Sequence, residues 1–353
     1  MSVPAALRVD FLPLQGLSRQ SAPWWKGVLG VVGFETAPEL DRTRSEIPVT
    51  ASSTPLLGSD QPLCEVWRAD DVQTTQSAAI HRSGRVRYRH DGKLLFGCVR
   101  IEESTSSPGQ PGSAIALRTA TEQAYAELFA VVRQAGYPYL IRVWNYLPDI
   151  NAHCDGDERY RHFNSARQSA FAQAGSGCAS GFPAASALGC QTGSPVSIHF
   201  LAARDMPLML ENPRQISAYH YPRQYGEHSP LFSRACILAM RGDAYLFLSG
   251  TASILGHQTM HPGDVKAQTR ESMTNITALI EEANRSVHGR KFLPGALKYK
   301  VYVRRHQDQP SIASELGRWL QGPASVVYLQ ADVCREDLLV EIEASGTATV
   351  DGA

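Results

Sequence analysis

The sequence lacks any long, uninterrupted hydrophobic run. Within its 353 residues no apolar stretch reaches the ~18 residues that a membrane-spanning helix needs. The N-terminus has no basic segment followed by an apolar one, so we expect neither a membrane anchor nor a secretion signal. Lys plus Arg and Asp plus Glu both total 34, which gives a formal net charge of zero. Because proteins that bind nucleic-acid phosphates are usually basic, this balance argues against a nucleic-acid partner.

Metal-binding and phosphate-binding motifs are missing as well. The seven cysteines are scattered and none forms a CxxC pair, so their spacing predicts neither a zinc site nor a disulfide framework. His257 and His261 are four residues apart, but Gly256 and Pro262 beside them argue against a helical metal pair. No glycine-rich loop has the P-loop or dinucleotide spacing. These absences favour a cytoplasmic protein without a metal.

Alternating strand and helix patterns fill the first part of the chain after a poorly periodic stretch of about 60 residues. An Asp91-Gly92 pair between two strand-like runs predicts a hairpin. The Gly-, Ala- and Ser-rich stretch 174–193 is interpreted as a loop over a site. The predicted strands are 27–34, 63–67, 86–90, 94–101, 137–146 and 197–203, and the predicted helices are 114–135 and 159–174.

A second set of the same kind follows. Its predicted strands are 235–240, 244–249, 297–303, 325–333 and 338–344, and its predicted helices are 264–284 and 312–320. Strand–helix–strand units combined with antiparallel hairpins predict an α+β fold, in which helices cover one face of a mixed sheet. The sequence therefore predicts that this plan occurs twice.

The segment RYRHFNSAR (159–167) is one of three stretches with dense polar and aromatic residues. In a helix, Tyr160, Asn164 and Arg167 share one face. That face is either an exposed basic surface or an anion clamp, since arginine binds carboxylates through two parallel hydrogen bonds. The pattern alone leaves both interpretations open.

The second stretch, ENPRQISAYHYPRQYG (211–226), has prolines that exclude a long helix. Tyr219 and Tyr221 alternate, so both side chains point to one side of an extended segment. They either pack a seam between domains or line a binding site.

The third stretch, CREDLLVEIE (334–343), alternates carboxylates with aliphatic residues. On a strand, Glu341 and Glu343 point to the same side. That side faces solvent in the commoner case, or it faces a cleft in which a buried Glu341 keeps its proton near neutral pH. Cys334 has no histidine nearby in sequence, which argues against a nucleophilic thiol.

These stretches carry a resemblance to a known family. The segments SPLFSRA (229–235), LFLSGTA (246–252) and LVEIE (339–343), with scattered positions between 263 and 284, resemble the RidA/YjgF fold. The longer segments 159–171 and 211–226 resemble the chorismatases, which pair two RidA-like domains and act on chorismate. The resemblance covers roughly residues 85–345. It implies a divergent N-terminal RidA-like domain over 1–210 and a C-terminal RidA-like domain over 211–353 that carries the catalytic glutamate.

The resemblance also implies the chemistry. Glu341 would protonate the enolpyruvyl ether of chorismate, and Tyr160, Arg167, Tyr221 and Arg304 would bind the substrate, with no metal or organic cofactor. Family members that release 3-hydroxybenzoate resemble this chain in having a glycine at position 250 and a cysteine at position 334. Room at Gly250 and the sulfur of Cys334 would favour displacement by a ring hydroxyl over attack by water. Some of these members also release 4-hydroxybenzoate, and the products enter aromatic and pigment biosynthesis.

Three alternatives follow from the same resemblance. A hydrolysing chorismatase would give a dihydroxycyclohexadiene carboxylate, but those members carry alanines where this chain has Gly250 and Cys334. A RidA-type imine deaminase would carry an arginine near Ser325, and this chain has none there. The third alternative belongs to another class of protein: a non-catalytic RidA-like binder of small carboxylates. Such a binder is distinguished from the enzymes because it binds its ligand without turnover. RidA proteins are trimers, so a chain with two such domains is expected to be a monomer or a trimer.

Overall fold

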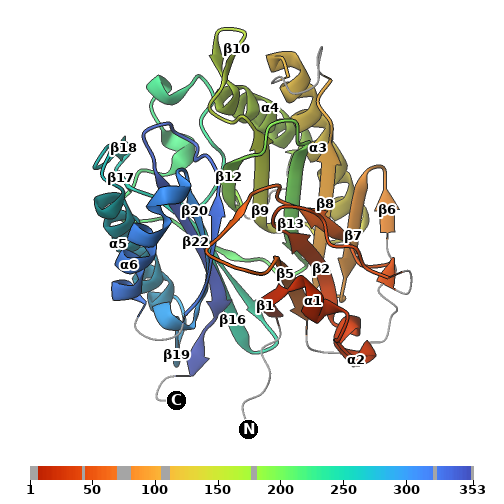
Figure 1. The fold of residues 1–353 in the computed structure, drawn as a ribbon. Coiled ribbons are helices and arrows are strands. Elements are labelled where there is room, and N and C mark those ends of the chain that lie inside the picture. The colour runs from red at the N-terminus through yellow and green to blue at the C-terminus, as the bar shows by residue number, and fades with distance from the viewer. Residues whose placement is uncertain are drawn as a thin grey trace.

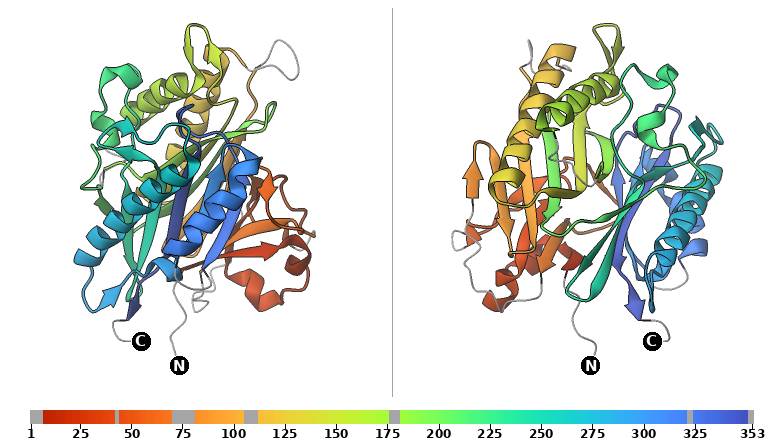
Figure 2. Two further views of the ribbon diagram at one scale, coloured as in Figure 1. Left: turned by 60° about the vertical axis from the view of Figure 1, so that its left-hand side comes forward. Right: turned by 180° about the vertical axis from the view of Figure 1, so that it is seen from behind.

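The computed structural model describes residues 7–41, 44–69, 81–104, 112–175, 181–320 and 324–350. These residues form three sheets of four or more strands, two of which carry helices on their outer faces (Figures 1 and 2). None of the helices described is both long enough and apolar enough to cross a membrane. Both described ends of the chain lie at the same end of the molecule (Figure 1).

The first unit is a six-stranded sheet in the order β12-β9-β13-β8-β7-β6. Its hairpin turns at Asp91-Gly92 as predicted, because Gly92 has a φ of 92° and the Asp91 carboxylate accepts the backbone N–H groups of Lys93 and Leu94. Helices α3 and α4 pack on one face of this sheet. The elements are β6 (His81–Ser83), β7 (Val86–His90), β8 (Leu94–Ile101), α3 (Ala114–Gln134), β9 (Tyr139–Pro148), α4 (Arg159–Ala174), β12 (Ala184–Cys190) and β13 (Val196–Ala203).

The second unit repeats this plan. Its sheet has the order β14-β15-β16-β22-β20-β21-β4, so β21-β20-β22-β16-β15 corresponds strand by strand to β12-β9-β13-β8-β7. Each sheet has one parallel pair among antiparallel ones, which confirms the predicted mixed α+β class. The elements are β14 (Leu208–Leu210), β15 (Ala235–Met240), β16 (Asp243–Ala252), α5 (Val265–Arg285), β20 (Lys298–Val303), α6 (Gln309–Trp319), β21 (Ser325–Gln330) and β22 (Val340–Thr347).

The N-terminal segment adds a third sheet of its own, in the order β1-β5-β2-β3. The three sheets meet in a common core, where the Trp67 ring lies 5.5 Å from Trp144 and 6.0 Å from Phe247. The stretch that was poorly periodic in sequence therefore covers the inner faces of both repeated units. Its elements are β1 (Leu7–Pro13), α1 (Leu14–Leu17), α2 (Ala22–Lys26), β2 (Val28–Gly33), β3 (Val49–Ala51) and β5 (Leu63–Ala69), while β4 (Leu56–Leu57) extends the second sheet.

Among the described residues, three short pairs of strands lie outside the larger sheets. They are β10 (His153–Cys154) with β11 (Asp157–Glu158), β17 (Ile254–Leu255) with β18 (Gln258–Thr259), and β19 (Arg290–Lys291) with β23 (Thr349–Val350). The division of the chain at residue 210 stays a prediction. The two repeated units lie on either side of it, although β14, which ends at Leu210, pairs with the second sheet.

One prediction is wrong: stretch 174–193 is not a loop throughout, because β12 (Ala184–Cys190) runs through it parallel to β9. Its alanines and its glycine have low strand propensity, which hid the strand in the sequence. The small side chains have a packing reason. β12 abuts β16 of the second unit, where the Ala185 N–H donates to the Ser249 hydroxyl at 2.9 Å. Bulkier residues would keep the two units apart.

Candidate active site

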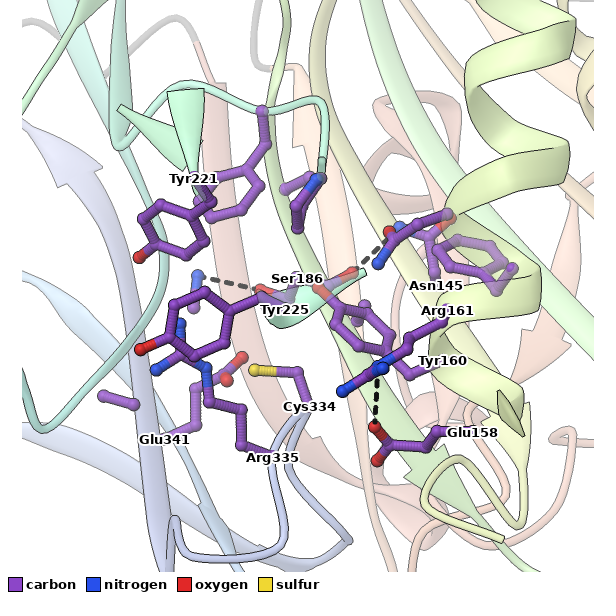
Figure 3. Close-up of a pocket in the computed structure, with 18 of the residues that line it drawn as sticks. Asn145, Glu158, Tyr160, Arg161, Ser186, Tyr221, Tyr225, Cys334, Arg335 and Glu341 are labelled. Carbon is purple, nitrogen blue, oxygen red and sulfur yellow. Dashed lines mark hydrogen bonds and ion pairs between the residues drawn. The ribbon is translucent and has the colours of Figure 1, made fainter. Parts of the chain in front are cut away.

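A cavity of about 400 Å³ opens at this contact between the two units. Helix α4 and strand β12 line it from the first unit, and strands β16 and β22 line it from the second. The irregular segments 221–234 and 334–337 complete the wall (Figure 3). Its volume lies in the range of pockets that hold small metabolites.

Glu341 lies inside this cavity, on β22 opposite Ala252 of β16 and Tyr302 of β20. Its side chain is 3% exposed and makes no hydrogen bond or ion pair within the described part of the chain. Burial, reinforced by the neighbouring Glu343 carboxylate, raises the pKa of Glu341 to about 8. The residue therefore lies in a cleft rather than in solvent and carries a proton at neutral pH.

Gly250 makes room for this carboxyl group. The pairing of β16 with β22 shifts register between Leu248 and Thr251, and this bulge brings Gly250 to the cavity wall. A Cβ atom built on Gly250 would lie 1.9 Å from Glu341 Oε1 and 3.0 Å from Ser186 Oγ. The space that the absent Cβ leaves at Gly250 is therefore occupied by the Glu341 carboxyl group, and the predicted effect of Gly250 on the product stays a prediction.

Cys334 lines the same cavity from the segment that precedes β22 (Figure 3). Burial, together with the charge of Glu341, raises the pKa of the Cys334 thiol to about 12. The thiol is therefore neutral at physiological pH. A neutral thiol is a poor nucleophile, which agrees with the absence of a nearby histidine in the sequence.

Helix α4 directs unpaired donors at the cavity. Arg167 donates through Nε to the Tyr125 hydroxyl and through Nη1 to the Leu231 carbonyl, both at 2.6 Å. Its Nη2 atom and the Asn164 Nδ2 atom are buried and have no acceptor among the described residues. Buried donors are rarely left unpaired, so these two nitrogens are available to an acceptor inside the cavity. Tyr160, one turn earlier, also lines the cavity, and burial raises its pKa well above 10.

A second cationic group faces the cavity from the other unit. Arg234 donates from Nη2 to the Tyr221 hydroxyl at 2.7 Å, and its buried Nε has no described acceptor. The Arg335 guanidinium stacks 3.9 Å above the Tyr225 ring and 5.3 Å from that of Tyr221 (Figure 3). Sequence reasoning missed both arginines, although Arg234 lies in the SPLFSRA segment and Arg335 directly follows Cys334.

Arg304 is not brought into the cavity wall. Its guanidinium donates to the carbonyls of Leu338, Val333 and Arg335 at 2.7 to 3.0 Å, and to Asn151 and Asp332. It therefore fixes the segment that carries Cys334 and Arg335. The other predicted residues, Glu341, Cys334, Gly250, Tyr160, Arg167 and Tyr221, all line the one cavity.

The two histidines four apart lie outside any helix. His257 contacts the Tyr225 hydroxyl through Nδ1 at 3.2 Å, and His261 has a φ of 56° outside any helix. No group of three potential metal ligands occurs among the described residues.

A buried carboxyl group with a raised pKa, placed in a cavity beside arginines, is the arrangement that acid catalysis on an anionic substrate requires. The comparisons with known proteins agree with this chemistry. The family model described as "Chorismatase FkbO/Hyg5-like, N-terminal" matches residues 65–202. A 3-hydroxybenzoate synthase from Streptomyces hygroscopicus is 35% identical over 93% of this chain and 94% of its own length.

Two further relatives support the same assignment. A chorismatase from Streptomyces rapamycinicus is 35% identical over 90% of this chain and 91% of its own length. The crystal structure of a chorismatase superposes with a TM-score of 0.81 at 31% identity, covering 98% of this chain and 99% of that one. The chain belongs to the chorismatase family.

Proposed function

We propose that this enzyme converts chorismate to 3-hydroxybenzoate and pyruvate by acid-catalysed cleavage of the enolpyruvyl ether. The observation that supports it most is the buried Glu341 carboxyl, which holds its proton up to about pH 8 inside a 400 Å³ cavity. The relative named 3-hydroxybenzoate synthase is similar over nearly the whole chain. The cavity needs no metal or organic cofactor for this chemistry, because the substrate supplies the reacting groups.

Chorismate carries two carboxylates, and the cavity offers two sets of donors for them. Asn164 and Arg167, one helical turn apart on α4, hold one carboxylate through their unpaired nitrogens. Arg234, with Tyr221 bound to it, holds the other. The positive charge of Arg234 acts to lower the pKa of Glu341, so the two side chains are neighbours. We therefore assign Arg234 to the carboxylate of the enolpyruvyl group, because the methylene carbon of that group must lie against the acid.

The reaction then follows from the position of the proton. Glu341 transfers its proton to the terminal methylene carbon, which becomes a methyl group and leaves a cationic centre on the ether carbon. The bond between the ring and the ether oxygen breaks, its electron pair forms the keto group of pyruvate, and the neighbouring ring hydroxyl bonds to the ring carbon. That oxygen loses its own proton, which restores the acid, and it bridges the two ring carbons as an epoxide. Its bond to the carbon that first carried the hydroxyl then breaks, the carbon that lost the ether releases its hydrogen as a proton while the oxygen takes one up, and the ring aromatises. The atoms of the two products add up to those of chorismate, so no water is consumed.

The choice between aromatic and hydrolysed products depends on which oxygen reaches the ring carbon. Glu341 fills the space beside Gly250, and the neutral Cys334 thiol lines the adjacent wall. Both features limit room for a water molecule behind the ring and favour the internal hydroxyl. 4-Hydroxybenzoate is the expected minor product, since the bridging oxygen breaks its bond to either of the two ring carbons when the ring aromatises.

We further propose a monomeric, cytoplasmic enzyme. The N-terminal sheet covers the inner faces of both repeated units, so these faces are not available to another subunit. The six cysteines that the structure describes are free thiols, as a reducing compartment favours. Light scattering after size-exclusion chromatography should give the mass of one chain, and a threefold mass would contradict this.

The test of function is incubation of the purified protein with chorismate, with pyruvate and aromatic products followed by chromatography. We expect equal amounts of pyruvate and of hydroxybenzoates, mainly the 3-isomer. Pyruvate accompanied only by a non-aromatic diene would overturn the product assignment. Saturable binding of chorismate without any pyruvate would show a carboxylate-binding protein instead of an enzyme.

A further inference from the structure

A buried ion cluster lies directly behind the catalytic cavity, and the mechanism above does not use it. Its members are Glu65 on β5, Arg142 on β9, Lys300 on β20 and Glu343 on β22, each at most 4% exposed. Lys300 Nζ bonds Glu65 Oε2 at 2.8 Å and Glu343 Oε1 at 2.9 Å, and Arg142 Nη2 bonds Glu343 Oε2 at 2.6 Å. The cluster joins the four-, six- and seven-stranded sheets.

Glu343 is fixed as an anion by this geometry. Besides Lys300 and Arg142, it accepts hydrogen bonds from Trp144 Nε1 at 2.7 Å and from the Ser186 hydroxyl at 2.6 Å. Each of its two oxygens therefore accepts hydrogen bonds from two donors. Protonation of Glu343 would have to break one of these hydrogen bonds, because no lone pair is left for the added proton. Burial alone would raise the pKa of Glu343, but Lys300 and Arg142 hold it below its ordinary value.

Two structural links connect this anion to the acid. Glu341 and Glu343 are two residues apart on β22, so their side chains leave the same face of the strand about 6–7 Å apart. The Ser186 hydroxyl donates to Glu343 and accepts from the N–H of Gly250, the residue against which the Glu341 carboxyl lies. The two carboxyl groups differ sharply: Glu343 has four donors, and Glu341 has none among the described residues.

We propose that Glu343 is a positioning residue that keeps Glu341 protonated, acting as a permanent buried anion that opposes a second negative charge on the same face of β22. This deepens the proposed function and rests on it, because it assigns the source of the proton that the reaction consumes. The Lys300–Glu65 pair holds the anion in place from the N-terminal sheet.

The other charged and titratable groups around Glu341 act differently. Arg142 from β9 and Arg234 ahead of β15 favour its ionised form, whereas the Cys334 thiol and the Tyr160 hydroxyl are neutral. Glu343 is the neighbour that favours the protonated acid, in addition to burial itself. Its removal leaves the two arginines unopposed, so the acid should ionise at lower pH.

The test compares two variants, Glu343→Gln and Glu65→Gln. Glu65→Gln is the matched control, because it removes the other carboxylate of the same cluster, and Glu65 lies further from the cavity than Glu343. The readout is the midpoint at which Glu341 ionises, followed by difference infrared spectroscopy of its carboxyl band, which is identified by its loss in Glu341→Gln. The pH at which kcat/KM for chorismate falls is measured beside it. We expect a midpoint near pH 8 in the wild type and in Glu65→Gln. In Glu343→Gln we expect it to fall by about one pH unit or more.

Equal midpoints in all three proteins would overturn the proposal, and so would equal shifts in both variants, because a merely structural cluster predicts similar behaviour. If Glu343→Gln does not fold, a double variant with Glu343→Gln and Lys300→Met replaces it. This double variant removes one buried charge of each sign, and it should still lower the pH midpoint at which Glu341 ionises. An unchanged midpoint in that double variant would also overturn it. The infrared titration needs no turnover, so an absence of pyruvate in the wild type would refute the proposed function while this measurement still tests Glu343.

Discussion

Replacing Gly250 with alanine tests whether the glycine places the acid. The added Cβ would lie 1.9 Å from Glu341 Oε1, whereas ordinary van der Waals contact begins at 3.4 Å. The carboxyl group must therefore retreat by about 1.5 Å (3.4 − 1.9), since the Gly250 backbone is fixed by β16 and by the Ser186 hydroxyl. A displacement of about 1 Å at a reacting group costs about 100-fold in rate.

We expect kcat for pyruvate release to fall by about 10- to 100-fold in Gly250→Ala, which corresponds to about 1.4–2.7 kcal/mol of lost transition-state stabilisation. The aromatic share of the product should fall as well, because the retreating carboxyl frees space for water. Pyruvate is measured by coupling to lactate dehydrogenase, and the ring products by chromatography.

A matched control is Gly346→Ala, on β22 but outside the cavity, where the new Cβ would meet the flexible Leu297 side chain at 2.8 Å. It should alter thermal stability without altering kcat or the products. Gly250→Ala with the wild-type rate and the wild-type product ratio would refute the placement of Glu341 against this glycine.

Three further outcomes follow from the same geometry. Glu341→Gln should lower kcat by about 100-fold or more with the fold intact by circular dichroism, and a near-normal rate would remove the residue from the mechanism. The folded protein holds the Glu341 proton to about pH 8 and the unfolded chain releases it near 4.5, so this residue's stabilising contribution is lost as the pH rises through that window. The unfolding free energy of Glu341→Gln, measured in urea, should therefore increase relative to that of the wild type between pH 5 and pH 8. A difference between the two unfolding free energies that stays constant over this range would contradict the raised pKa. Arg167→Met should raise KM about 10-fold or more by removing a carboxylate ligand, whereas loss of stability without any change in KM would limit Arg167 to packing.

Much of the site could be predicted because its residues lie on elements with clear periodicity. Helix α4 (Arg159–Ala174) has the predicted bounds, and its 3.6-residue period places Tyr160, Asn164 and Arg167 on the face that lines the cavity. The strict alternation along β22 likewise placed Glu341 and Glu343 on one face. Local patterns of this kind depend only on backbone geometry.

The rest depends on contacts between residues far apart in sequence. Strand β12 has small side chains because it abuts β16 of the other unit, a reason that no local pattern shows. Arg304 was expected to bind substrate, yet its guanidinium is taken up by the backbone of segment 333–338. Arg234 lies in a segment without periodicity, and its role emerges only when Tyr221 folds over it.

The N-terminal sheet was the least predictable part. Its strands are separated by irregular segments, and its Trp67 becomes interpretable only against Trp144 and Phe247 of the two repeated units. Glu65 could not be interpreted from the sequence for the same reason, because its partner Lys300 lies 235 residues further along the chain.

In the proposed reaction, a proton exchangeable with solvent passes from Glu341 to the methylene carbon of chorismate. Turnover in D2O, with pyruvate reduced at once to lactate by lactate dehydrogenase, tests this claim by mass spectrometry of the lactate methyl group. One deuterium is expected in that methyl group. A methyl group without deuterium would show that the hydrogen comes directly from the substrate ring, and would contradict acid catalysis by Glu341.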